Sequence, residues 1–95
     1  MKNITEFILE SKTYVDEFMD YAMEHADGML GDNSDEHWCN INKIKNGDDD
    51  ELNYFVNTVM QRTCNINDQP REILDNKLVI AQLKKDIKKL IIDEY

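Results

Sequence analysis

Cysteine and long apolar runs are both scarce in this sequence. Its 95 residues include two cysteines, Cys39 and Cys64, too few for the disulfide framework of a small secreted domain. The opening stretch MKNITEFILESK is interrupted by Glu6 and Glu10, so we expect no signal peptide. No stretch approaches the roughly 18 apolar residues that a membrane-spanning helix needs. These absences predict a cytoplasmic protein with reduced thiols and no membrane partner.

Basic residues are fewer than acidic residues in this sequence. The chain has 20 acidic residues against 11 lysines and arginines, a formal net charge of −9 at pH 7. A surface of this sign repels phosphate groups, so we expect no direct binding to DNA, RNA or anionic lipid. The partners it favours are cationic: a metal ion, a basic patch on a second copy, or a protein that itself binds nucleic acid. An acidic surface also aids solubility, and this simpler explanation stays open.

Signatures of catalysis and metal binding are missing as well. The sequence contains no C-x-x-C pair, no glycine-rich phosphate loop and no nucleophile elbow. His37 and Cys39 are close in the chain, but no further ligand stands near them. The oxygen-rich stretches DNSDE and NGDDDE depart from the calcium loop of an EF-hand. We therefore predict no enzyme, no cofactor and no metal site.

Strand patterns are absent too, because apolar and polar residues nowhere alternate over a sustained run. Apolar residues instead recur at steps of three and four in several segments, the spacing of amphipathic helices. We predict an all-α protein with a single domain (1–95), a compact bundle of four helices at about 4–27, 34–46, 49–64 and 70–94.

Polar residues, glycine and proline predict where these helices begin and end. The expected signals are an N-cap at Asn3, a stop at Gly28, an N-cap at Asn33 or Ser34, a capping box over 48–51 and a first-turn proline at Pro70.

Basic residues are nearly missing from the first predicted helix, where Lys12 is the only one. At about 100° per residue, acidic residues gather in one arc opposite the apolar side, in a stripe roughly 30 Å long. The members of this stripe are Glu6, Glu10, Glu17, Asp20, Glu24 and Asp27. Like charges three or four residues apart destabilise a helix, whereas surface helices usually alternate Glu with Lys. A basic partner would offset this repulsion, but a solvated acidic face explains the pattern equally well.

The negative charge is also segregated along the chain. Residues 1–51 contain 14 acids and four bases, whereas residues 52–95 contain six acids and seven bases. Solubility does not require such segregation, so we predict a dedicated acidic surface. Beyond the stripe, we expect this surface to include Asp32, Asp35, Glu36, Asp49 and Asp50. The lysines of the last predicted helix can be a solvated face, or can dock on the acidic surface of a second copy as a homodimer.

The opening MKNITEFILES resembles the beginnings of many short phage-encoded proteins. In size, acidity and helix content the chain resembles small anti-defence proteins of phages and mobile elements, the DNA-mimic type that blocks host nucleases. This resemblance implies action in the host cytoplasm. Colicin-type immunity proteins are also small, acidic and four-helical, but their tyrosine pair is missing here because Tyr54 is followed by Phe55.

These patterns lead to one expected function and one alternative. We expect a small acidic binding protein that inhibits a basic, nucleic-acid-binding enzyme, such as a nuclease of a defence system, through its carboxylate-rich face. The alternative is a structural or self-assembling helical protein, for example a phage morphogenesis component or an oligomeric scaffold. In that case the acidic stripe has no inhibitory role.

Overall fold

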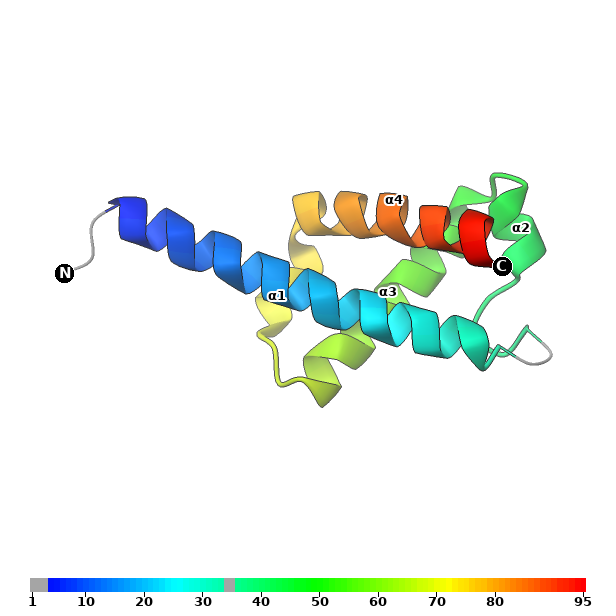
Figure 1. Cartoon of the computed structure of the whole chain (residues 1–95), viewed down its shortest axis with the longest axis horizontal. Coiled ribbons are helices and arrows are strands. Elements are labelled where there is room, and N and C mark those ends of the chain that lie inside the picture. Colours follow the sequence, from blue (N-terminus) through cyan, green and yellow to red (C-terminus); the bar gives the residue numbers. More distant parts are fainter. Residues whose placement is uncertain (1–3, 34–35) are drawn as a thin grey trace.

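The computed structural model describes the backbone of residues 4–33 and 36–95, and the side chains of residues 15–33 and 36–95. Four α-helices, three of them long, pack against one another (Figure 1), and the described residues form no β-strand. The elements in chain order are α1 (Ile4–Gly31), α2 (Ile41–Lys45), α3 (Asp49–Ile66), the 3-10 turn η2 (Arg71–Asp75) and α4 (Lys77–Glu94). The predicted all-α bundle of four helices is confirmed. None of the helices in the described ranges has the length and apolar character needed to cross a bilayer.

The long helices are arranged so that α1 and α4 run beside each other in the same direction, with α3 packed across both (Figure 1). The first turns of α1 extend beyond the other helices. At the opposite end, the last turn of α4 lies near the last turns of α1, beside the short helix α2. The pair α1–α4 therefore presents two parallel helix surfaces along one side of the molecule.

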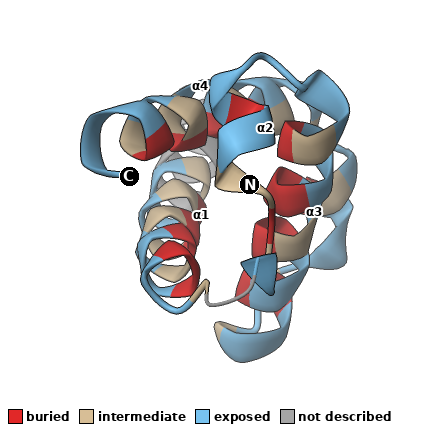
Figure 2. Cartoon of the chain, turned by 90° about the vertical axis from the view of Figure 1, so that its right-hand side faces the viewer, coloured by how far each residue is buried: buried red, intermediate tan, exposed pale blue. Residues whose placement is uncertain are grey.

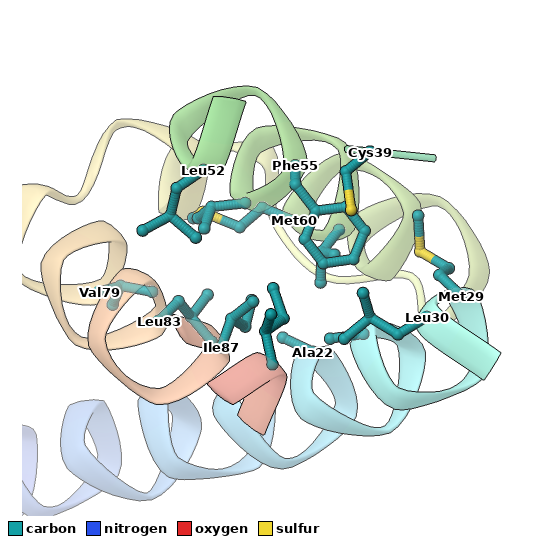
Figure 3. Close-up of a cluster of buried hydrophobic side chains, with 14 of the residues drawn as sticks. Ala22, Met29, Leu30, Cys39, Leu52, Phe55, Met60, Val79, Leu83 and Ile87 are labelled. Atoms are coloured by element: carbon teal, nitrogen blue, oxygen red, sulfur yellow. The ribbon is translucent and has the colours of Figure 1, made fainter. Parts of the chain in front are cut away.

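A single apolar cluster fills the space between these helices (Figure 3). Its fully buried members include Phe18, Ala22 and Ala26 from α1, Ile44 from α2, Phe55, Val56, Val59 and Met60 from α3, and Leu83, Ile87 and Ile91 from α4. The four-residue steps on α1 and α4 put one side of each helix into the core, as the amphipathic spacing predicts. Figure 2 shows buried residues facing the interior and exposed residues on the outer sides of the helices.

Helix α1 does not stop at Gly28, and that prediction was wrong. The helix continues to Gly31 because Met29 and Leu30 are buried, with 4% and 3% of their surface exposed. Burying two large apolar side chains outweighs the cost of about 1 kcal/mol for glycine inside a helix. The predicted N-cap Asn3 lies outside the described residues.

The second helix is much shorter than the predicted segment 34–46. Helix α2 spans only Ile41–Lys45, and Asn40 is its N-cap. Asn33 does not cap this helix. Its side-chain oxygen accepts from the backbone N–H groups of Trp38 and Cys39, at 2.7 and 3.2 Å, and its amide donates to the Cys39 carbonyl at 2.9 Å. Asn33 therefore stabilises an irregular loop, while Ser34 lies outside the described residues.

The last helix also begins later than predicted. Pro70 precedes η2 rather than α4, because Ile73 packs into the core and draws this turn inward. Helix α4 then starts at Lys77, where the Asn76 side chain accepts from the N–H groups of Leu78 and Val79 at 3.0 and 3.2 Å.

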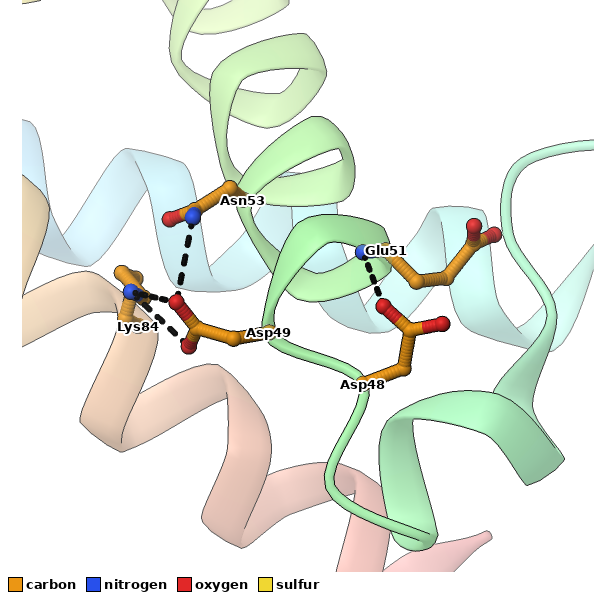
Figure 4. Close-up of polar contacts among 5 residues, drawn as sticks. All are labelled: Asp48, Asp49, Glu51, Asn53 and Lys84. Carbon is orange, nitrogen blue, oxygen red and sulfur yellow. Dashed lines mark hydrogen bonds and ion pairs between the residues drawn. The ribbon is translucent and has the colours of Figure 1, made fainter.

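Of the two hydrogen bonds of the capping box predicted over 48–51, one is present. Asp48 is the N-cap of α3 and accepts from the Glu51 N–H at 3.0 Å (Figure 4). The Glu51 carboxylate, however, accepts from the backbone N–H of Asn40 at 2.8 Å, rather than from that of Asp48. The Glu51 side chain therefore links the first turn of α3 to the N-cap residue of α2.

We predict that Asp48→Ala lowers the free energy of unfolding by about 1 kcal/mol, because it leaves the Glu51 N–H in the first turn of α3 without its side-chain acceptor. Asp50→Ala is the matched control, since Asp50 is an exposed acid in the same first turn. Urea unfolding followed by circular dichroism measures both. Equal destabilisation by the two variants would show that the Asp48 cap contributes nothing beyond its charge.

Candidate functional site

Four exposed carboxylates follow the outer side of α1, and we call them the acidic ridge. They are Glu17, Asp20, Glu24 and Asp27. Their spacing of three and four residues keeps them along one side of the helix, while the other side lies in the core. For these four residues, the structure brings together what the sequence pattern predicted. The side chains of the other two stripe residues, Glu6 and Glu10, lie outside the described part of the chain.

The ridge is not neutralised by any described lysine or arginine. The one ion pair among the described side chains joins Lys84 to Asp49 and does not involve the ridge. Ridge carboxylates instead accept hydrogen bonds from neutral phenols: the Tyr21 hydroxyl donates to Glu17 at 3.1 Å, and the Tyr95 hydroxyl donates to Asp27 at 2.9 Å. These hydrogen bonds are the main cause of the raised pKa of both tyrosines. Both phenols therefore stay neutral at pH 7 and bring no positive charge to the ridge.

Tyr95 was not singled out from the sequence, and it joins two elements far apart in the chain. Its hydroxyl also donates to the backbone carbonyl of Asp27 at 3.2 Å. This contact holds the end of α4 against the last turns of α1. Acidic residues near the end of α4 are thereby placed beside the ridge.

A shallow hollow of about 510 Å³ lies between α1 and α4, and we call it the acidic groove. It is lined by Asp20, Met23, Glu24 and Asp27 of α1 and by Leu90 of α4. Leu90 also borders a second hollow of about 240 Å³ on α4, whose other lining residues are Asp86, Lys89, Asp93 and Glu94. Three more carboxylates, accompanied by one lysine, therefore continue the acidic surface from α1 onto α4.

The α4 part of this surface was not predicted from the sequence, because the lysines dominate the polar face of the last helix. A signal was available. Asp86, Leu90 and Asp93 follow one another at steps of four and three, which places them on one side of a helix. What the spacing does not reveal is that this side of α4 lies next to α1.

On the other side of α1 a smaller hollow of about 140 Å³ is bordered by Glu24, His25 and Asp32, together with the loop and α3. Here Arg62 supplies a positive charge, with its guanidinium 5.6 Å from the centre of the Trp38 ring. The predicted site residue Asp32 thus lies across α1 from the acidic groove, beside a cation of the same molecule. Glu24 borders both hollows and is the central residue of the ridge.

Three of the acids at 48–51 have structural roles within the fold, namely Asp48, Asp49 and Glu51 (Figure 4). Lys84 lies 3.0 Å from Asp49, and its hydrogen bond is the main cause of the lowered pKa of that carboxyl group. Asn53 donates to the same carboxylate at 3.2 Å. Since Asp49 is paired within the molecule, we leave it out of the candidate surface, although the sequence predicted it there.

The remaining predicted site residues are scattered. Asp50 is exposed on the first turn of α3, and Glu36 is exposed in the loop before α2, where it accepts from the Asn40 amide at 3.2 Å. Asp35 lies outside the described residues. The candidate site is therefore the acidic ridge with the groove beside it, and it does not extend over every acid of the first half of the chain.

The two cysteines are buried and free. Burial raises the pKa of the Cys39 thiol to about 11, and Glu51 and Glu36 add to the shift. Burial also raises the pKa of Cys64, although Arg71 works against the shift. Nucleophilic chemistry needs the thiolate, so neither thiol is activated. In the described ranges, no three His, Cys, Asp or Glu residues gather as a set of metal ligands.

We predict that Cys39 in the folded protein reacts with iodoacetamide at least about 100-fold more slowly than in the unfolded chain at pH 8. A pKa about two units above the ordinary thiol value leaves about a hundredth of the thiolate. Mass spectrometry after alkylation, with and without guanidinium, measures the ratio at each cysteine. A Cys39 that reacts as fast in the folded state as in the unfolded state would contradict this account of the thiol.

No protein-family model, curated protein or solved structure matches this chain. Function is therefore inferred from the residues and their arrangement. On the described surface, the feature with the clearest chemical preference is the acidic ridge and its continuation on α4, which suit a cationic partner.

Proposed function

We propose that this protein is a small acidic binding protein that inhibits a basic, nucleic-acid-binding enzyme through the acidic ridge of α1. The observation that carries the proposal is a row of four exposed carboxylates with no cationic partner among the described side chains. Repulsion between neighbouring like charges destabilises the free helix. A partner that supplies lysine and arginine side chains removes this repulsion and gains charge-assisted hydrogen bonds.

The density of charge supports an enzyme that binds nucleic acid. The ridge spans ten residue steps, from Glu17 to Asp27, or about 15 Å of helix. Duplex DNA carries about nine phosphates over that length. Asp86, Asp93 and Glu94 bring the local count to seven carboxylates, accompanied by Lys89. The number of carboxylates on this surface is therefore comparable to the number of phosphates that a nucleic-acid-binding site contacts over the same length.

Competition with DNA tests the proposal. Immobilised protein is incubated with a bacterial extract at low salt and eluted with a sodium chloride gradient, because charge pairing gives fast, salt-sensitive association. We expect a basic nucleic-acid-binding enzyme among the eluted proteins. The protein should then inhibit that purified enzyme, and increasing duplex DNA should displace it. An enzyme that binds the protein and DNA at the same time, at full activity, would refute the proposed inhibition.

A second candidate function is supported by a separate observation on α4. Leu78 and Ile92 lie outside the core, with 84% and 54% of their surface exposed, which suits a self-assembling helical protein. Analytical ultracentrifugation at low and high salt distinguishes the two functions. A salt-resistant oligomer supports assembly through apolar contacts, whereas a monomer or a salt-sensitive dimer supports the binding protein.

A further inference from the structure

The acidic groove has an apolar floor. Met23 of α1 and Leu90 of α4 are partly buried, pack against the core, and line the same hollow. Carboxylates border this floor from two neighbouring hollows that share Leu90. Asp20, Glu24 and Asp27 of α1 line the groove itself, and Asp86, Asp93 and Glu94 line the hollow on α4. Among the side chains that the structure describes, Lys89 is the only base that lines either hollow.

This arrangement has a defined chemical complement. A partner that docks through a flat phosphate-binding surface needs only negative charge on this protein. An apolar floor in the groove would not strengthen its binding. An amphipathic helix instead lays its apolar side chains into a groove between two helices, in the recurring helix-in-groove mode. If the residues beside its apolar stripe are lysine and arginine, they meet the carboxylates of the groove and of the neighbouring hollow.

Ile92, an exposed apolar residue elsewhere on α4, does not offer the same complement. Ile92 lies three, four and seven residues after Lys89, Lys88 and Lys85, so these lysines share its side of the helix. A basic helix is repelled there. Leu90 and Ile92 therefore lie on one helix with opposite charges around them, and of these two positions only Leu90 favours a cationic partner.

We infer that the acidic groove receives a basic amphipathic helix of the partner, with apolar side chains on Met23 and Leu90 and lysine or arginine on both sides. This inference rests on the proposed function and narrows it, because it states which kind of basic segment is bound. The partner contacts the groove through a helix rather than through an open phosphate-binding surface alone.

Three synthetic peptides test the inference. The first is a lysine–leucine peptide that is amphipathic as a helix, the second has the same composition in scrambled order, and the third is an oligolysine of equal charge. Isothermal titration calorimetry at about 20 and 150 mM salt measures each affinity, because screening weakens the purely electrostatic part. We expect the amphipathic peptide to bind at least about tenfold more tightly than the other two, and to keep more of its affinity at the higher salt.

Two variants and one spectroscopic measurement locate the binding. Leu90→Ala should remove most of the tenfold advantage, whereas Ile92→Ala, the matched control on the same helix, should leave it unchanged. Because Leu90 also packs against the core, circular dichroism verifies that the variant folds. Independently of any variant, the methyl NMR signals of Met23 and Leu90 in the wild-type protein should shift when the amphipathic peptide is added.

The outcomes separate this inference from the proposed function. If oligolysine shifts the backbone signals of the ridge but the amphipathic peptide binds no better, the apolar floor has no role and the inference fails alone. If the methyl signals of Ile92 move instead of those of Leu90, the groove is the wrong site. If no basic peptide binds at low salt, the proposed function fails and the inference fails with it.

Discussion

Replacing Asp20, Glu24 and Asp27 together by lysine is expected to weaken binding to the cationic partner at least about 100-fold. Each substitution exchanges an attraction for a repulsion, and losses at three neighbouring positions accumulate over a surface where charge pairing dominates. The three side chains are exposed, and Tyr95 keeps the backbone carbonyl of Asp27 as an acceptor, so the fold should be retained, which circular dichroism verifies. Calorimetry or surface plasmon resonance with the captured enzyme measures the loss, which should be largest at low salt.

A matched control separates the position of the charge from its amount. Asp50, Glu72 and Asp75 are exposed acids outside α1 and α4. Changing them to lysine raises the net charge from −9 to −3, as the ridge substitutions do. We expect the control variant to bind within about threefold of the wild-type protein, since charges beyond the Debye length of roughly 8–10 Å are largely screened. Equal losses in the two variants would show that net charge alone determines the affinity.

Phe55→Ala is expected to lower the free energy of unfolding by about 3–5 kcal/mol. Phe55 is completely buried in the cluster that joins α1, α3 and α4, and truncating a buried phenylalanine removes its transfer free energy and leaves a cavity. Domains of this size have a total stability of about 5–15 kcal/mol, so a large part of the margin is lost. Urea or thermal unfolding followed by circular dichroism measures the change.

Tyr54→Ala is the control for this effect. Tyr54 neighbours Phe55 on α3 but has 65% of its surface exposed, so its loss should change stability by no more than about 0.5 kcal/mol. Equal destabilisation by both variants would mean that α3 is not oriented with Phe55 in the core.

Helical periodicity predicted the three long helices and their buried sides, because that signal depends only on local spacing. Phe18, Phe55 and Leu83 are buried as the three- and four-residue steps require. The short elements were predicted less well, since their limits are set by tertiary contacts. Asn33 serves a loop rather than a helix, because its partners lie five and six residues later at Trp38 and Cys39.

For the candidate site, the sequence predicted the α1 residues that the structure places in one row, whereas other predicted acids lie elsewhere on the molecule. The ridge follows from spacing on one helix, whereas the contribution of Leu90 and Asp93 depends on how α4 packs against α1. Asp49 was predicted in the partner-binding surface, whereas in the structure it pairs with Lys84, which lies 35 positions away in the chain. Local charge counts do not detect an ion pair between such distant residues.

Zero-length carbodiimide cross-linking of the complex with the captured enzyme tests the central claim most directly, because it couples only carboxylates and amines that are in contact. We predict that mass spectrometry finds couplings from Glu17, Asp20, Glu24 or Asp27 to lysines in the nucleic-acid site of the enzyme. Couplings confined to Asp50, Glu72 and Asp75, with none from the α1 carboxylates, would show that the enzyme docks elsewhere on the molecule.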